Sequence, residues 1–240
     1  EQARALLDTA EQRYPNLASI YRQRATFFRS AGDLAAAEKE LAHAAALGDA
    51  GPEYLRAAAE IALDKKDWDG AIALGEQLLA TGADPARANL ALALAYERKQ
   101  EPEKALALLE HLDVMVLVDT PELLLARAEM QISLQQTEPA QATIALYRRA
   151  YPEHSGIFQY LEARELLVNG SPDEAAQKLA LVIESNPEMV RAQFFQAVAY
   201  LQAGKTDLAR QVLETYLRNA PDDEVARNLL KRVSEGPGTA

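Results

Sequence analysis

The chain has 240 residues, of which 49% are hydrophobic and 25% are charged, so it is long and apolar enough to bury a sizeable core. Its formal charge of -11 disfavours binding to nucleic acids and to anionic membranes, because both depend on clustered Lys and Arg side chains. The absence of Cys excludes disulfides and thiol chemistry, and no apolar stretch reaches the roughly 18 to 20 residues that cross a bilayer.

Similar segments follow one another along the chain, and each predicts a pair of helices. Residues 1–15 match the second helix of a truncated segment. Six complete segments follow, with starts 34 or 35 residues apart, at 18–51, 52–85, 86–120, 121–155, 156–189 and 190–223. Residues 224–235 predict a capping helix, and residues 236–240 are expected to form a disordered tail. The first residue is not Met, so the sequence gives no information about an upstream signal peptide or anchor.

Two positions are alanine in all six segments. The eighth position holds Ala25, Ala59, Ala93, Ala128, Ala163 and Ala197. The twentieth holds Ala37, Ala71, Ala105, Ala140, Ala175 and Ala209. This pattern predicts that the paired helices touch at these positions, because a larger side chain in such a contact costs roughly 1 to 3 kcal/mol.

Glycine and proline mark the predicted helix ends. The fifteenth position, where the first helix of a pair must end, is glycine in three segments: Gly32, Gly170 and Gly204. The thirty-second position, just past the second helix, is proline in three: Pro152, Pro187 and Pro221. The sequence SPDE at residues 171–174 predicts a capping box at the start of a second helix.

One stretch departs from the pattern, the sequence VMVLV from Val114 to Val118. It is short and rich in β-branched residues, so the preferred interpretation is a frayed helix end and a linker folded back on the body. The alternative is an exposed apolar strip that docks a partner.

The alanine positions, the turn glycines and the terminal prolines resemble the tetratricopeptide repeat family. The resemblance extends over nearly the whole chain, although the family's Trp at the fourth position is absent and its eighth-position Gly is Ala here. It implies an all-α fold, a right-handed superhelical solenoid of antiparallel helix pairs. Residues 1–235 are accordingly expected to form a single domain of about six complete repeats, with an N-terminal half repeat and a C-terminal capping helix.

The resemblance also implies that the first helices line a concave groove, with the fifth, ninth and twelfth positions facing inward. The expected partner-binding residues are polar and partly basic at one end and apolar or aromatic at the other: Arg22, Arg29, Arg56, Leu90, Leu94, Leu125, Ile132, Tyr160, Arg164, Leu167, Phe194, Val198 and Leu201. The alternative is that tight curvature buries the apolar ones against each other.

Catalytic and metal-binding motifs are missing. The three histidines, His43, His111 and His154, lie far apart and outside any HExxH pattern, and no glycine-rich phosphate loop or nucleophile elbow occurs. Three glutamates on first helices, Glu60, Glu97 and Glu129, are better explained as solvated groove charges than as an acid/base pair. We therefore predict a protein that is not an enzyme and that carries no cofactor and no metal.

A protein interaction scaffold is the preferred function, with a protein or peptide partner in the groove. By analogy, such alanine-rich, acidic repeats suggest part of a bacterial envelope export or secretion assembly, with the periplasm slightly favoured. A groove that binds or guides a polysaccharide, with Tyr160 and Phe194 stacking on sugars, and a cytoplasmic adaptor or co-chaperone-like protein are the alternatives. A clamp for acidic C-terminal tails is not expected, because Arg22 and Thr26 stand where the family's clamp has Lys and Asn.

Overall fold

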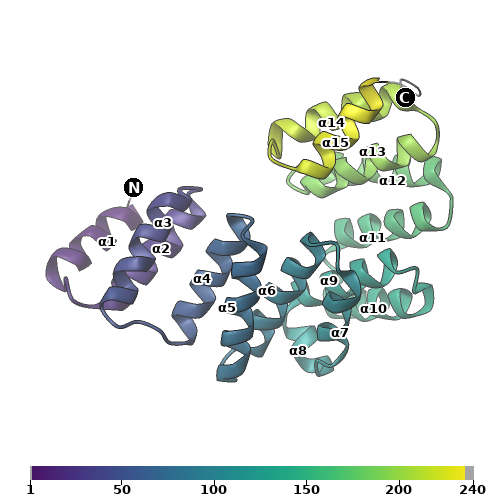
Figure 1. The fold of residues 1–240 in the computed structure, drawn as a ribbon. Helices are drawn as coiled ribbons and strands as arrows, with labels where there is room; N and C mark the ends of the chain where they lie inside the picture. The colour runs from purple at the N-terminus through teal and green to yellow at the C-terminus, as the bar shows by residue number, and fades with distance from the viewer. Residues whose placement is uncertain (1, 236–240) are drawn as a thin grey trace. The chain divides into compact units, whose positions relative to one another are not determined.

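The computed structural model describes residues 2–235, and helices connected by short turns make up this part of the chain, without a strand. Figure 1 shows them in order. The helices are α1 Gln2–Arg13, α2 Ala18–Ser30, α3 Leu34–Ala46, α4 Pro52–Asp64, α5 Trp68–Thr81, α6 Pro85–Arg98, α7 Pro102–Glu110, α8 Val114–Asp119, α9 Pro121–Ser133, α10 Thr137–Ala150, α11 Ser155–Val168, α12 Pro172–Ser185, α13 Val190–Gln202, α14 Thr206–Asn219 and α15 Glu224–Glu235. The all-α prediction is confirmed.

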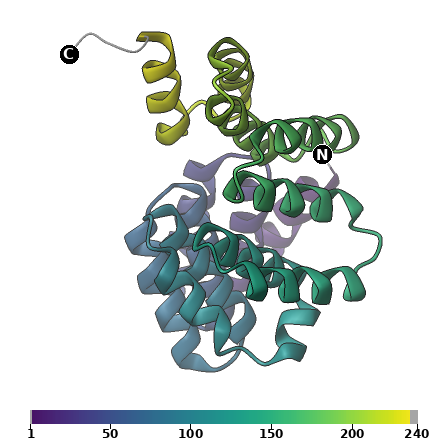
Figure 2. The ribbon, with the colours of Figure 1, turned by 90° about the vertical axis from the view of Figure 1, so that its right-hand side faces the viewer.

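Consecutive helices pack in pairs within two compact units, one up to Met130 and one from Gln131 on. In unit 1 the pairs include α2 with α3, α4 with α5 and α6 with α7, and in unit 2 they include α11 with α12 and α13 with α14 (Figure 1, Figure 2). The boundary between the units falls within α9. The expected disordered tail, residues 236–240, lies outside the described residues.

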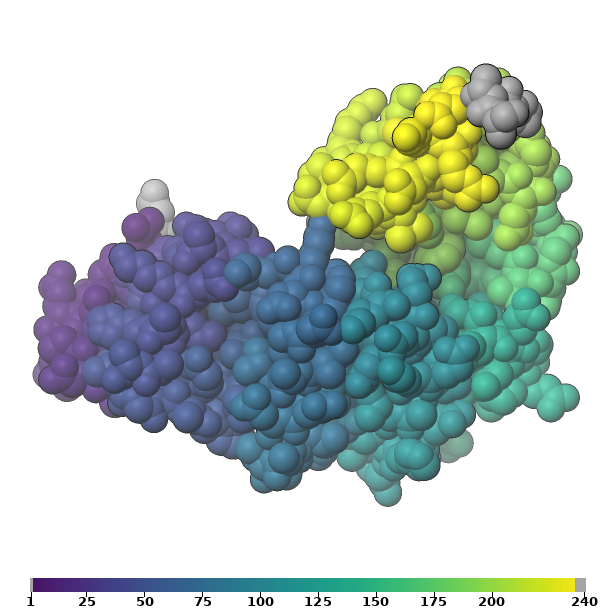
Figure 3. Space-filling model, in the orientation of Figure 1, coloured from purple at the N-terminus to yellow at the C-terminus, as the bar shows by residue number. Residues whose placement is uncertain are grey.

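The alanine prediction is confirmed at every position. Each of the twelve alanines at the eighth and twentieth positions is at most 1% exposed. The contacts are tight because no atom lies beyond the β-carbon, so the helix backbones approach closely. In α1, Ala3 takes the twentieth position of the truncated segment, yet it is exposed, because the described residues include no first helix to cover it. Figure 3 shows α1, in purple, at the outer end of unit 1.

The fifteenth position has a left-handed backbone in all six repeats. Glycine occupies it in three, as predicted, with φ of 79° at Gly32, 76° at Gly170 and 73° at Gly204. The other three repeats place ordinary residues there, with φ of 64° at Lys66, 61° at Gln100 and 58° at Gln135. The turn geometry is therefore fixed by the helix pair, and the sequence meets it with glycine in only half of the repeats.

Two sequence interpretations are wrong. Val114 to Val118 is not a frayed end and linker but the body of α8, a helix that begins after Asp113 and contains the fully buried Leu117. The capping box at residues 171–174 does not form: Ser171 is the N-cap residue of α12 and Pro172 lies in the first turn as expected, but the Ser171 side chain makes no capping hydrogen bond.

The C-terminal helix α15 packs against α14 through one apolar face. Ala226 and Val233 are buried there in a cluster with Leu213 and Tyr216, and Leu229 and Leu230 pack against that cluster. Arg227 and Lys231 remain exposed on the opposite side. This arrangement agrees with the capping helix expected from the sequence.

Candidate interaction surface

The first helices of successive repeats contact one another, α2 with α4 and α4 with α6 in unit 1, and α11 with α13 in unit 2. Their side chains at the fifth, ninth and twelfth positions therefore follow each other along one side of each unit. We call the unit 1 part of this side the α2–α6 face. The predicted groove residues divide between the two units.

The basic residues of the α2–α6 face are engaged in ion pairs. Arg29 pairs with Glu60 at 2.9 Å and with Asp64 at 3.1 Å, joining α2 to α4. Arg56 pairs with the same Glu60 at 3.2 Å and with Glu53 at 3.0 Å. The hydrogen bond from the Arg56 guanidinium holds the pKa of Glu53 below its ordinary value.

Arg22 continues this pattern through an ion pair with Asp49, which follows α3. Three guanidinium groups thus face four carboxylates, those of Asp49, Glu53, Glu60 and Asp64. The sequence suggested a partly basic end, but the structure neutralises it and leaves a small acidic excess.

The middle of the α2–α6 face is apolar. Leu90 and Leu94 on α6 are half-buried, and so is Leu125 on α9. Leu63 on α4 is half-buried as well and packs against the cluster formed by Ala62, Ala71 and Ala95. Leucines in this state still offer surface that a partner can cover.

In unit 2 the side chains at the corresponding positions are mostly buried. Ile132, Tyr160, Arg164 and Leu167 are each at most 7% exposed. The Arg164 guanidinium donates hydrogen bonds to the Tyr160 hydroxyl at 3.1 Å and to the Ser133 hydroxyl at 3.0 Å. These residues are part of the packing around α11 and offer little exposed surface to a partner.

Phe195 contacts two of the predicted groove residues, Arg164 and Tyr160, and the sequence pattern does not identify it. The Arg164 guanidinium lies 3.7 Å from the centre of its ring, and the Tyr160 ring lies 6.0 Å from it. The adjacent aromatic pair Phe194 and Phe195 is the signal in the sequence, but helical spacing assigned only Phe194 to the groove. A cation over an aromatic ring contributes roughly 0.5 to 2 kcal/mol. Because Arg164 lies on α11 and Phe195 on α13, this contact stabilises the packing between the two helices.

Phe194, Val198 and Leu201 on α13 are half-buried. Phe194 and Leu201 pack against the cluster that contains Tyr216, and the Phe194 ring lies 5.7 Å from the Tyr216 ring. Of the two aromatic residues proposed to stack on sugars, Tyr160 is thus buried and Phe194 packs against Tyr216.

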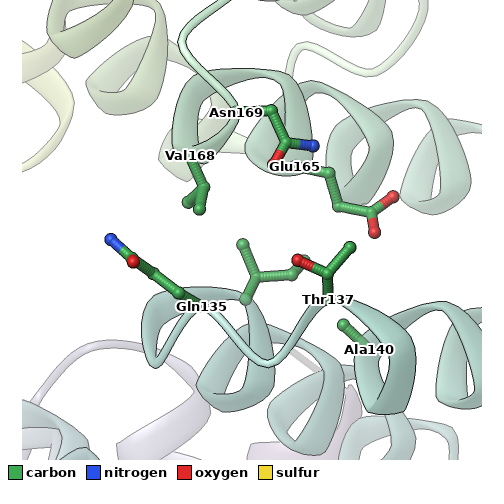
Figure 4. A pocket seen from close by; sticks show the side chains of 7 residues that line it. Gln135, Thr137, Ala140, Glu165, Val168 and Asn169 are labelled. Carbon is green, nitrogen blue, oxygen red and sulfur yellow. The ribbon is translucent and has the colours of Figure 1, made fainter.

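A small cleft in unit 2 lies between the turn after α9 and the end of α11 (Figure 4). It encloses about 10 Å³, the room that a single water molecule needs. Its lining residues are Ile132, Gln135, Thr137, Ala140, Glu165, Val168 and Asn169. Burial, and then the charge of Glu162, raise the pKa of Glu165, and its Oε1 atom is buried without a hydrogen-bond partner. The cleft is too small for a ligand.

The interpretation of three glutamates as solvated groove charges is wrong for Glu129, which is buried. Glu60 is held by Arg29 and Arg56, and Glu129 is only 3% exposed. Among residues 2–235, no group of three or more His, Asp or Glu side chains stands close enough to hold a metal ion. Over the same residues, every helix is too short or too polar to cross a membrane.

Paired helices with small residues at their contacts and a shared side of first helices define a helical repeat protein. The sequence profile of the tetratricopeptide repeat matches residues 56–113 and 160–224, about half of the chain. The chain therefore belongs to the tetratricopeptide repeat family. A comparison with curated proteins finds no match.

Several solved structures share the fold at low sequence identity. A chain of the APC/C hetero-tetramer Cut9–Hcn1 superposes with a TM-score of 0.74 at 13% identity, over 97% of this chain but 46% of that one, so this chain spans about half its length. PilF of Pseudomonas aeruginosa gives a TM-score of 0.64 at 20% identity, over 82% of this chain and 88% of that one. PilW, described as a type IV pilus biogenesis factor, gives 0.61 at 18% identity, over 89% and 98%.

Proposed function

We propose that this protein is a non-catalytic interaction scaffold whose α2–α6 face binds a protein or peptide partner. The family supports the general role, because tetratricopeptide repeats bind protein partners. The observation that carries the proposal is the pair of half-buried leucines on α6, Leu90 and Leu94, next to α4 with its ion-paired carboxylates. A partner segment with apolar anchors next to Lys or Arg matches this surface.

The expected affinity for a partner is modest and depends on both the leucines and the carboxylates of this face. Burying a leucine completely stabilises by about 1.5 to 3 kcal/mol, and these leucines are already half-buried, so covering them contributes on the order of 1 kcal/mol each. The carboxylates are screened by their arginine partners, so they add selectivity for a cationic partner more than affinity.

A photo-cross-linking side chain placed at Leu94 tests the proposal in the cell. We expect it to capture a specific protein, while the same side chain at Leu181, which is 60% exposed on α12, does not. The captured protein is then purified, and its affinity is compared between the wild type and the L90S/L94S variant. Equal affinity for both, at unchanged helicity, would refute the α2–α6 face as the binding surface.

The finer part of the proposal is a role in a bacterial envelope export or secretion assembly. Its support is a likeness of fold to PilF and PilW, the second of which is a type IV pilus biogenesis factor. Cell fractionation and affinity purification of the tagged protein from its source organism test this role. Recovery with cytoplasmic partners alone would contradict it and favour a cytoplasmic adaptor.

A further inference from the structure

The second helix of the third repeat is broken. In the other complete repeats the second helix has 13 or 14 residues, in α3, α5, α10, α12 and α14. Here α7 stops after 9 residues at Glu110, and the 6-residue α8 begins at Val114. Figure 1 shows α8 as a separate short helix following α7. The break changes which side chains this repeat exposes.

The short helix α8 is held firmly in place. The Asp113 carboxylate accepts a hydrogen bond from the Met115 backbone N–H at 2.7 Å, and the Asp113 carbonyl accepts one from the Leu117 N–H at 3.1 Å. Leu117 is completely buried, so this side of the helix packs against the rest of the protein. The side chains on the other side of α8 are therefore presented by a fixed backbone, which lowers the entropy cost of binding.

Those side chains are apolar and open to solvent. Val114 is 54% exposed and Met115 is 64% exposed. Methionine is common at binding surfaces, because its flexible, polarizable side chain adapts to different partners. We call Val114 and Met115, with the acidic residues that flank them, the α8 strip.

The charged residues in the segment that carries the α8 strip are all acidic. Residues 110–122 contain four carboxylates, Glu110, Asp113, Asp119 and Glu122, and no Lys or Arg. All four residues are exposed. A second copy of the chain would bring the same carboxylates together, and an anionic membrane would be repelled in the same way. The negative charge of this segment therefore favours a cationic partner.

We propose that the α8 strip docks a cationic amphipathic segment of a partner protein. Apolar side chains of the partner cover Val114 and Met115, while its Lys and Arg side chains pair with Glu110, Asp119 and Glu122. This surface lies on a second helix of the third repeat, whereas the α2–α6 face is built from first helices, so the inference does not depend on the proposed function.

Methionine methyl groups give a direct test, because the chain has only three Met residues. With ¹³C-methyl methionine, the Met115 signal reports on the strip and the buried Met130 serves as an internal reference. The probe is a synthetic amphipathic peptide of about 15 residues with Leu on one face and Lys on the other, compared with a peptide in which Glu replaces Lys. We expect the Lys peptide to shift the Met115 signal saturably, and rising salt to weaken the binding.

Three variants separate the strip from general attraction to an acidic protein. V114S/M115S should weaken binding of the Lys peptide about tenfold, measured by fluorescence anisotropy, a loss of about 1.4 kcal/mol. L181S, which removes an exposed leucine on α12, should leave the affinity unchanged, and L90S/L94S should leave the peptide-induced shift of the Met115 signal unchanged. A Met115 signal that does not move, an equal response to the Glu peptide, or a response only to vesicles or to a second copy of the chain would overturn the proposal.

Discussion

The Tyr216 hydroxyl donates a hydrogen bond of 2.7 Å to Oδ2 of Asp223, and this bond ties the end of α14 to the start of α15. Oδ1 of the same carboxylate accepts a hydrogen bond from the Ala226 backbone N–H at 3.0 Å, so Asp223 caps α15 as well. The fourth repeat has the same arrangement at the same two positions, where the Tyr147 hydroxyl lies 3.2 Å from Nδ1 of His154. A tyrosine near the end of a second helix thus secures the entry to the next helix twice in this chain.

Replacing Tyr216 with Phe should lower the free energy of unfolding by about 1 kcal/mol, because the hydrogen bond to a charged acceptor is lost while the ring remains. Asp223→Ala should cost more, about 2 kcal/mol, because it also removes the cap of α15. Urea denaturation measures both. Tyr200→Phe, on the half-buried Tyr200 of α13, is the matched control and should have little effect. Equal losses for Y200F and Y216F would contradict the assignment.

The left-handed turn residues give a second prediction. An L-residue in this backbone region costs roughly 1 to 2 kcal/mol, and glycine avoids that cost but loses more chain entropy on folding. Gln100→Gly should therefore stabilise the protein by about 0.5 to 1 kcal/mol, and Gly204→Ala should destabilise it by a similar amount. Gln177→Gly, at an exposed position inside α12, should instead destabilise by about 1 kcal/mol. Thermal unfolding distinguishes these outcomes, and a destabilised Q100G would show that the turn is not strained.

The helix contacts can be tested by overpacking. Ala163→Leu places a large side chain at a completely buried position of α11, so it should cost about 1 to 3 kcal/mol or prevent folding. Ala180→Leu, on the exposed side of α12, should change the stability by less than about 0.5 kcal/mol. If A163L does not fold, Ala163→Ser offers a milder change whose cost can be measured. Equal stability of the Ala163 and Ala180 variants would remove the basis for the repeat packing.

Glu165 gives the protein a dependence on pH. Burial and the charge of Glu162 raise its pKa in the folded state, so the ionised carboxylate destabilises the fold at neutral pH. This cost disappears as the pH falls through the raised folded pKa towards the ordinary value of the unfolded chain. Glu165→Gln should therefore raise the melting temperature at pH 7, and this advantage should shrink at acidic pH. Glu184→Gln, on the exposed end of α12, should show no such pH-dependent gain.

The repeat pattern of the sequence was sufficient to predict the helix pairs, because spacing and residue size decide which helices touch. Ala25 and Ala209, far apart in the chain, were both placed correctly as contact residues. The sequence pattern locates the interruption at Val114 to Val118 but does not predict that this stretch is a helix, because β-branched residues disfavour a helix on propensity alone. The Asp113 cap and the burial of Leu117 outweigh that propensity.

The groove residues were harder to interpret than the fold, since helical spacing says which side of a helix a residue occupies but not what it contacts there. The sequence predicts basic groove positions at Arg29 and Arg56, whereas carboxylates from their own and neighbouring helices pair with them. Arg164 was assigned to the same kind of surface, but its contact with Phe195 depends on how closely α11 and α13 approach. Such distances are not encoded in the spacing of residues along a single helix.

The alanine contacts described above are interchangeable, because every repeat offers its neighbours the same small residue at the same two positions. Copying or removing one whole repeat of 34 residues, such as 52–85, keeps alanine at the same two positions on both sides of the new junction. The number of repeats can then change without redesign of the interior, while the solvent-facing positions of each repeat remain free to diverge.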